Sequence, residues 1–210
     1  VNGFKYDGDL DLTALEDTVV QEICFQQNCD GFIILCESSF KEADLKCDYR
    51  NSDGTRSFCG NGTRASFVYA RCEGLVGNKA VFEACDGHHR VERNDEHDAP
   101  SVEFRPVIAP ELLNSGDFFI DTGSPHHVHV VKDFNQLSEI EIETFGSNIR
   151  YSDDYSSIGG VNVSAFCHVI DGLALRTYER GVEAETKACG TGAVAASIVD
   201  YSINGGQTKR

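Results

Sequence analysis

The sequence predicts an α/β (α+β) protein built from two halves with the same organisation. In each half, short apolar strands precede a Cys-Gly-x-Gly turn, and a helical segment follows that turn at once. The two turns are Cys59-Gly60-Asn61-Gly62 and Cys189-Gly190-Thr191-Gly192. We therefore divide the chain into residues 1–116 and 117–210, and we expect the two turns to face each other.

The first half contains two helical patterns and several strand patterns. Apolar residues at helical spacing predict a helix over 14–26, and the apolar run at 31–36 is typical of a buried strand. Further predicted elements are a strand at 45–49 closed by a turn at 51–54, a helix at 63–73, and paired strands between 80 and 107 around a polar loop at 94–100.

The second half repeats this order. Its predicted elements are strands at 118–122 and 128–131, a helix at 137–145 ended by Gly146, a hairpin of 162–169 and 173–178, and a helix at 193–203. The hairpin is predicted because Asp171-Gly172 is a tight-turn pair between two apolar segments.

The charge of the chain excludes some classes of partner. Lys and Arg number 18 and Asp and Glu number 34 among 210 residues, which gives a formal net charge of −16. Binding to nucleic acid or to an anionic membrane needs a basic surface, so we expect neither. No apolar run suits a membrane helix and no signal peptide opens the chain, so we expect a cytoplasmic protein. The chain has no Met, and we expect the natural protein to extend beyond both ends.

The nine cysteines indicate free thiols. Their number is odd, and no pair has Cys-x-x-Cys spacing or lies in a Cys/His pattern of zinc ligands. We expect no metal and no disulfide framework, and we expect most of these thiols to be small buried apolar groups.

The Cys-Gly-x-Gly turns carry the chemistry of the sequence. A thiol at a helix N-terminus lies beside unpaired N–H groups and the positive end of the helix dipole, which lowers its pKa. Glycine neighbours let a ligand approach the backbone, and the same N–H groups can hold a carboxylate. One such turn alone is compatible with an anion site, a nucleophile or a tight connection.

Two such turns favour a more specific reaction. Inversion of a carbon centre needs a base on one face and an acid on the other, and two thiols can fill both roles without pyridoxal phosphate or metal. Two structural turns that arose by gene duplication are the alternative.

Four sequence blocks resemble those of the diaminopimelate epimerase family, in the same order. They are Asn-Ser-Asp-Gly (51–54) with Cys-Gly-Asn-Gly-Thr-Arg (59–64), Thr-Gly-Ser-Pro-His (122–126), Gly-Val-Asn-Val (160–163), and Arg-Thr-Tyr-Glu-Arg-Gly (176–181) with Glu-Thr (185–186) and Ala-Cys-Gly-Thr-Gly (188–192). The resemblance covers nearly the whole chain.

The resemblance implies a fold and an activity. It implies two pseudo-symmetric halves, each a curved, mostly antiparallel sheet around a central helix, with the active site in the cleft between them. It implies a cytoplasmic, homodimeric isomerase that interconverts LL- and meso-diaminopimelate without a cofactor, in lysine and peptidoglycan biosynthesis. The implied partner is a small-molecule amino acid.

The resemblance also implies roles for single residues. The implied catalytic set is Cys59 and Cys189 as the acid–base pair, with His126 and Glu179 beside the thiols. The implied substrate-binding set is Gly60, Asn61, Gly190 and Thr191 at the helix ends, and Asn51, Asn162, Glu179 and Arg180 toward the distal end. Arg180 can clamp a carboxylate with two hydrogen bonds, and the two Asn amides both donate and accept.

Some of these residues have local alternatives. Asn51 could close its own turn, Arg180 could form a surface ion pair with Glu179 or Glu183, and His126 could be a hydrogen-bonded loop residue. We assign no role to His127 and His129. We expect four other histidines to be structural or exposed, namely His88, His89, His97 and His168.

The chain departs from the family in three places. The family's opening Gly-Asn-Asp-Phe block and the strands after its second helix have no match here, and Gln26, Gln27 and Asn28 replace a Gly-Ile-Gly loop. The alternatives to a diaminopimelate epimerase are a related racemase for another amino acid, an inactive binding protein of the same fold, and a zinc- or disulfide-stabilised structural protein.

Overall fold

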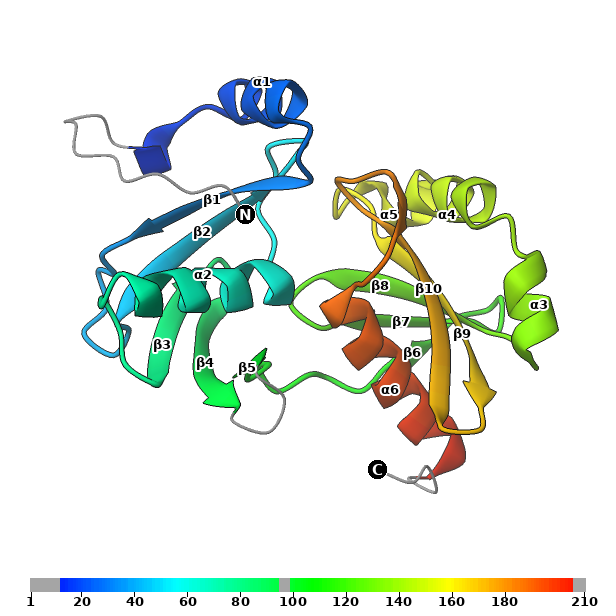
Figure 1. The fold of residues 1–210 in the computed structure, drawn as a ribbon. Helices are drawn as coiled ribbons and strands as arrows, with labels where there is room; N and C mark the ends of the chain where they lie inside the picture. Colours follow the sequence, from blue (N-terminus) through cyan, green and yellow to red (C-terminus); the bar gives the residue numbers. More distant parts are fainter. Residues whose placement is uncertain (1–11, 95–98, 206–210) are drawn as a thin grey trace. The chain divides into compact units, whose positions relative to one another are not determined.

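The computed structural model describes residues 12–94 and 99–205. The chain forms two compact units, Val1–Arg105 and Pro106–Arg210, and each has its own sheet (Figure 1). The division comes before Asp117 because the strand β6 (Glu111–Leu112) pairs with β7 (Phe118–Asp121), and Val107 packs on the core of the second unit. Cys59 therefore belongs to the first unit and Cys189 to the second.

The first unit has a five-stranded sheet in the order β1-β2-β3-β4-β5. All neighbouring strands are antiparallel except β2 and β3. The strands are β1 (Gly31–Cys36), β2 (Leu45–Asn51), β3 (Lys79–Ala84), β4 (Gly87–Asn94) and β5 (Ala99–Val102), and the helices are η1 (Leu12–Ala14), α1 (Asp17–Gln27) and α2 (Gly60–Cys72).

The helix α2 packs on this sheet through a small apolar core. Phe67 and Ala70 of the helix are buried with Phe82 and Val91 of the sheet. Near the start of the helix, a Cβ added at Gly62 would lie 3.2 Å from the Ile33 side chain, so this glycine permits close packing of helix on sheet. The core thus fixes the N-terminus of α2 against the strands.

The second unit has a six-stranded sheet in the order β11-β10-β9-β8-β7-β6, in which only β8 and β9 run parallel. Its remaining strands are β8 (Pro125–Val130), β9 (Asn162–Val169), β10 (Gly172–Glu179) and β11 (Ala184–Thr186). Its helices are α3 (Phe134–Glu139), α4 (Ile142–Arg150), α5 (Asp153–Ser156) and α6 (Gly190–Asn204).

Helices cover both faces of the second sheet (Figure 1). Along β9, alternate side chains point to opposite faces, as in any strand. Val163 and Ala165 pack with α3 and α4, whereas Phe166 packs with Ala195 and Val199 of α6. The α6 helix therefore packs on the face opposite to α3 and α4, as the central helix of its unit.

The structure confirms the predicted fold class, with two mostly antiparallel sheets that each carry a central helix. The hairpin and both helices after the Cys-Gly-x-Gly turns form as predicted. The short strands β6 and β11 and the helix α5 were not predicted, because two to four residues carry too little periodicity.

The prediction of one helix at 137–145 was wrong. Two helices, α3 and α4, cover this region, with Ile140 in an extended conformation between them. Gly146 lies inside α4 and does not end it. A glycine fits this position because a Cβ there would collide with the Tyr178 side chain. The predicted helix at 14–26 also starts later, at Asp17.

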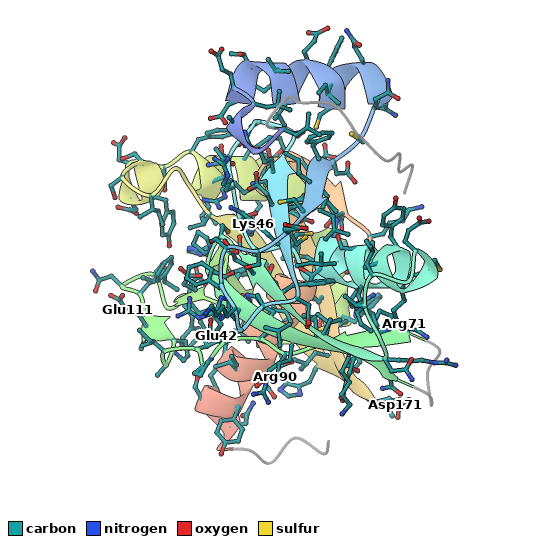
Figure 2. All side chains as sticks on the ribbon, turned by 90° about the vertical axis from the view of Figure 1, so that its left-hand side faces the viewer. Glu42, Lys46, Arg71, Arg90, Glu111 and Asp171 are labelled. Carbon is teal, nitrogen blue, oxygen red and sulfur yellow. The ribbon has the colours of Figure 1, made fainter. Side chains whose placement is uncertain are left out.

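Figure 2 shows charged side chains projecting from the surface of the molecule. Glu42, Arg90, Glu111 and Asp171 are all exposed. Among the described residues, no helix is long and apolar enough to span a bilayer.

The expectation that most thiols are buried was wrong. Four cysteines are buried, and these are Cys24, Cys47, Cys167 and Cys189. The other five are exposed or partly exposed, Cys59 among them, because they lie at helix ends, in turns and at strand ends.

Candidate active site

Cys59 is the N-cap residue of α2. Its backbone is extended, with φ −125° and ψ 102°, and its Sγ accepts a hydrogen bond from the Gly62 amide at 3.3 Å. Its carbonyl accepts hydrogen bonds from the amide of Thr63 at 2.8 Å and from the Thr63 hydroxyl at 2.9 Å. The sulfur therefore lies at the positive end of the helix and takes the place of a capping oxygen.

Cys189 caps α6 in the same way. Its φ of −118° and ψ of 107° are close to those of Cys59, and its Sγ accepts a hydrogen bond from the Gly192 amide at 3.4 Å. The Cys189 carbonyl accepts the first helical hydrogen bond, from Ala193 at 2.9 Å. The two Cys-Gly-x-Gly turns are thus the same local structure in two units.

The sheet face beneath α6 changes from apolar to polar toward Cys189. His126 of β8 pairs with Asn162 of β9, and Ser164 of β9 pairs with Thr177 of β10. These side chains share the face that carries Phe166 further along, because alternate residues of a strand point the same way. The strand register therefore collects buried polar groups next to the start of α6.

A continuous chain of hydrogen-bonding contacts joins Cys189 to this face. The Cys189 Sγ lies 3.3 Å from the Thr191 hydroxyl, and that hydroxyl lies 2.9 Å from His126 Nε2. His126 Nδ1 lies 3.2 Å from the Ser164 hydroxyl, which lies 3.1 Å from the Thr177 hydroxyl. His126 reaches the sulfur through Thr191 and has both ring nitrogens occupied.

His126 is neutral in this environment. The residue is completely buried, and burial together with the nearby charge of Arg180 lowers its pKa to about 3. A neutral imidazole donates one hydrogen bond and accepts another, which matches its two hydroxyl partners. A catalytic role of His126 stays a prediction, and its geometry makes it a hydrogen-bonding partner of Thr191.

Asn162 is buried and holds the segment that carries Arg180. Its Nδ2 donates to the Ser124 hydroxyl at 2.7 Å and to the Pro125 carbonyl at 3.1 Å, and its Oδ1 accepts from the Arg180 amide at 2.9 Å. Both Nδ2 hydrogens are thus used inside the protein. Asn162 therefore connects the loop before β8 to Arg180.

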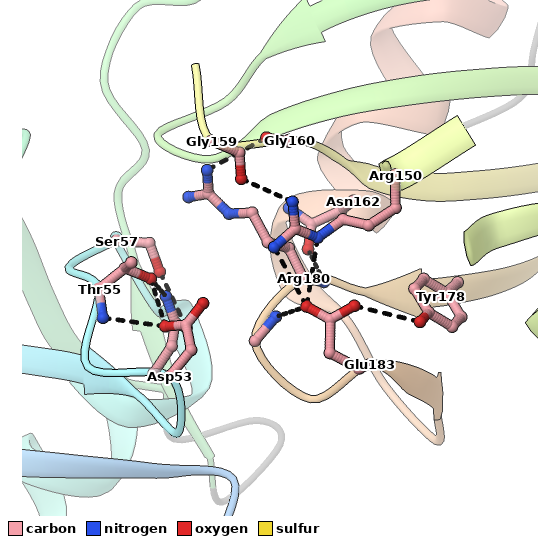
Figure 3. Close-up of polar contacts among 12 residues, drawn as sticks. Asp53, Thr55, Ser57, Arg150, Gly159, Gly160, Asn162, Tyr178, Arg180 and Glu183 are labelled. Carbon is pink, nitrogen blue, oxygen red and sulfur yellow. Dashed lines mark hydrogen bonds and ion pairs between the residues drawn. The ribbon is translucent and has the colours of Figure 1, made fainter. Parts of the chain in front are cut away.

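The Arg180 side chain is held by backbone carbonyls. Its Nη1 donates to the Gly160 carbonyl at 3.2 Å (Figure 3). The same Nη1 donates to the Ile158 carbonyl at 3.4 Å. Glu183, one of the two acids considered from the sequence as a partner of Arg180, forms an ion pair with Arg150 at 3.1 Å. Sequence reasoning missed Arg150.

Asn51 closes its own turn. Its Nδ2 donates to the Thr55 hydroxyl at 3.0 Å, and its backbone amide donates to the Thr55 carbonyl at 2.8 Å. Figure 3 shows the adjoining contact between Asp53 and Thr55 in the first unit, where the Thr55 amide donates to Asp53 Oδ1 at 2.9 Å. The local alternative for Asn51 therefore holds, and its contact with substrate stays a prediction.

The other predicted site residues lie in the first turn of α2 and at the end of β10. Asn61 is exposed in the first turn of α2, and Gly60 is buried beside it. Glu179 ends β10 and accepts a hydrogen bond from the Thr186 hydroxyl at 2.8 Å. In residues 12–94 and 99–205, no group of three or more His, Cys, Asp or Glu side chains could hold a metal ion.

Known proteins of similar sequence match most of the chain. A diaminopimelate epimerase from Flavobacterium psychrophilum is 39% identical over 86% of this chain and 69% of its own length. The chain belongs to the diaminopimelate epimerase family. The family model, described as diaminopimelate epimerase, matches residues 118–210, and an Aquifex aeolicus diaminopimelate epimerase is 38% identical over 82% of this chain. The chain spans 63% of that relative's length.

Membership of the diaminopimelate epimerase family confirms the function predicted from the sequence, an isomerase that epimerises diaminopimelate. Solved structures of low identity share the fold alone. A phenazine biosynthesis protein of the PhzF family from Bacillus anthracis matches 93% of this chain and 73% of its own, with a TM-score of 0.62 and 15% identity. A probable proline racemase from Agrobacterium radiobacter matches 86% of this chain and 62% of its own, with a TM-score of 0.61 and 13% identity.

Proposed function

We propose that this protein interconverts LL- and meso-diaminopimelate with Cys59 and Cys189 as its acid–base pair. The observation that supports the pair best is the match between the two helix caps, in which each sulfur accepts an amide hydrogen bond at 3.3 Å or 3.4 Å. The substrate is proposed from the relatives, which are named diaminopimelate epimerases.

In the proposed reaction one cysteine is a thiolate and the other is a thiol. The thiolate takes the α-proton from one face of the substrate carbon, and the thiol gives its own proton to the opposite face. One proton leaves the carbon and one arrives, so only the configuration changes. The two sulfurs exchange protonation states, and the reverse reaction uses the same groups in exchanged roles without a cofactor.

The helix ends stabilise the charge that develops in this reaction. Each helix begins with backbone N–H groups that have no partner within the helix, and its dipole favours negative charge there. We assign the α-carboxylate and amino group of the substrate to Gly60, Asn61, Gly190 and Thr191. Donors fixed before the reaction lower the barrier because they need no reorganisation as charge builds up.

The contribution of His126 is proposed to be indirect. Because its pKa is lowered to about 3, the imidazole is uncharged at neutral pH and cannot hold a thiolate as an ion pair. It instead orients the Thr191 hydroxyl, which lies 3.3 Å from the Cys189 sulfur. Glu179, at the end of β10, remains a proposed neighbour of the reacting groups.

The distal end of diaminopimelate carries a second amino group and a second carboxylate. Arg180 is proposed to bind this carboxylate, since a guanidinium can donate two parallel hydrogen bonds to it. Asn51 and Asn162 are proposed to complete the contacts, Asn162 chiefly by fixing the Arg180 backbone. The family resemblance also supports a homodimer that works in the cytoplasm.

Proton NMR in D₂O tests the proposal. Purified protein is incubated with LL-diaminopimelate without added cofactor, and with a panel of other L-amino acids in parallel. We expect loss of the α-proton signal of diaminopimelate together with appearance of the meso form. Turnover of another amino acid but not of diaminopimelate would contradict the proposed substrate.

A further inference from the structure

Glu183 has an unusual backbone conformation next to the Arg180 segment. Its φ is 59°, in the left-handed region that residues other than glycine rarely adopt. Its amide donates to the Glu179 carbonyl at 2.8 Å, so residues 179–183 form one closed turn with Arg180 inside it. A residue held in this conformation needs support from its surroundings.

The Glu183 carboxylate supplies that support. Its Oε1 accepts hydrogen bonds from the Gly181 amide at 3.0 Å and from Arg150 Nη2 at 3.1 Å, and its Oε2 accepts from the Tyr178 hydroxyl at 3.1 Å (Figure 3). Burial alone would raise the pKa of Glu183, but the Gly181 amide and the other donors lower it. Glu183 is therefore ionised, and its carboxylate stabilises the turn by accepting hydrogen bonds from within it.

Arg150 connects this turn to the carbonyls that hold the Arg180 guanidinium. While Arg150 Nη2 binds Glu183, its Nη1 donates to the Gly159 carbonyl at 2.6 Å. The next carbonyl, that of Gly160, accepts from Arg180 Nη1. Gly160 has a φ of 83°, and a Cβ there would collide with Arg150, so the loop and the arginine fit one another closely.

The ion pair between Glu183 and Arg150 thus supports both the backbone and the guanidinium of Arg180. Glu183 holds the backbone of its turn, and Arg150 holds the loop that receives its guanidinium. The Arg150 side chain is only 9% exposed and that of Glu183 is 31% exposed, so the pair is partly shielded from solvent. Asn162 also anchors Arg180, because its Oδ1 accepts a hydrogen bond from the Arg180 amide.

We propose that Glu183 and Arg150 are positioning residues that set the direction of Arg180 toward the distal carboxylate of the substrate. This inference rests on the proposed function, in which Arg180 binds that carboxylate. Neither residue is assigned any contact with the reacting carbon. Loss of the pair should therefore weaken substrate binding and leave proton transfer at Cys59 and Cys189 largely intact.

The test uses two variants at the same position. Glu183→Gly removes the carboxylate but suits the positive φ, so it does not add backbone strain. Glu183→Gln keeps the size of the side chain and removes its charge. We expect both to raise KM for diaminopimelate by about 10-fold or more while kcat stays within about 3-fold, the pattern of an interaction lost equally from ground and transition states.

Glu185→Gln is the matched control. Glu185 lies in the same segment and also pairs with an arginine, since its Oε1 lies 2.7 Å from Arg176 Nε. Both of its carboxylate oxygens accept from Arg176, which lies outside the turn at 179–183. We expect its KM to stay within about 2-fold of the wild-type value, because an exposed pair of this kind contributes little.

Two competitive inhibitors separate positioning from a general loss of structure. 2-Aminopimelate retains the distal carboxylate, whereas 2-aminoheptanoate lacks it. Glu183→Gly should weaken inhibition by 2-aminopimelate by about 10-fold and that by 2-aminoheptanoate by less than about 2-fold, because only the first uses Arg180.

Equal weakening of both inhibitors, or an unchanged KM in the Glu183 variants, would overturn the inference. If Glu183→Gly does not fold, the same comparison with Glu183→Gln decides. A wild-type protein that turns over no diaminopimelate contradicts the proposed function and this inference with it. An active wild type with unaffected Glu183 variants contradicts the inference alone.

Discussion

His126 illustrates at the scale of one residue how burial changes a role. The sequence placed it in a motif beside the thiols, and an imidazole with an ordinary pKa would be a candidate base there. In the fold it is completely buried between the hydroxyls of Ser164 and Thr191. Its role could not be predicted from the sequence, because it depends on which side chains the strand register brings to its two nitrogens.

The burial of His126 predicts a dependence of stability on pH. Its pKa is lowered from 6.5 to about 3, so between these values the unfolded chain binds a proton that the folded chain does not. The contribution of neutral His126 to the free energy of unfolding is fully present above pH 6.5. Between pH 6.5 and about 3, this free energy should drop by about 1.4 kcal/mol for each unit by which the pH falls.

Urea unfolding at pH 6 and pH 5 measures this slope. We compare wild type with His126→Gln, which lacks the titrating group, and with His168→Gln, which removes a half-exposed histidine paired with Asp200. In the wild type, the free energy of unfolding should differ between pH 6 and pH 5. This difference should be smaller by about 1 kcal/mol in His126→Gln and unchanged in His168→Gln. An unchanged slope in His126→Gln would mean that the imidazole is not buried in its neutral form.

At the scale of elements, local patterns predicted some parts of the fold better than others. The hairpin of β9 and β10 and the strand β1 were predicted because apolar runs and turn residues mark them locally. The prediction of one helix at 137–145, ended by Gly146, was wrong. A glycine can either end a helix or permit close packing, and the sequence does not distinguish these two uses. Gly146 is of the second kind, against Tyr178.

Gly146→Ala tests that explanation. A methyl group would collide with Tyr178 and force α4 away from β10, so we expect a loss of about 1–3 kcal/mol in the free energy of unfolding despite the better helix propensity of alanine. Gly77→Ala is the control, because a Cβ at Gly77 meets nothing within 4 Å. Chemical denaturation measures both, and equal stability of the two variants would refute the close contact.

At the scale of the whole molecule, the repeated motif was the most informative part of the sequence. Cys59 and Cys189 were predicted at two helix starts, and both are N-caps with an amide hydrogen bond to sulfur. The supporting residues Ser164, Thr177 and Arg150 could not be predicted, since ordinary strand and helix positions carry no local signal of such a role. Ser164 and Thr177 lie on the face beneath α6 because alternate side chains of a strand point the same way. Which face that is becomes known only with the register of β9 and β10.

The central claim is that two thiols serve opposite faces of one carbon. The most direct measurement follows α-proton exchange in D₂O for Cys59→Ser and Cys189→Ser, each with LL- and with meso-diaminopimelate. We expect both variants to lose interconversion by at least about 1,000-fold, and any exchange that remains should occur with retention, from opposite stereoisomers in the two variants. Near-normal interconversion by either variant, or exchange of the same stereoisomer in both, would contradict the account.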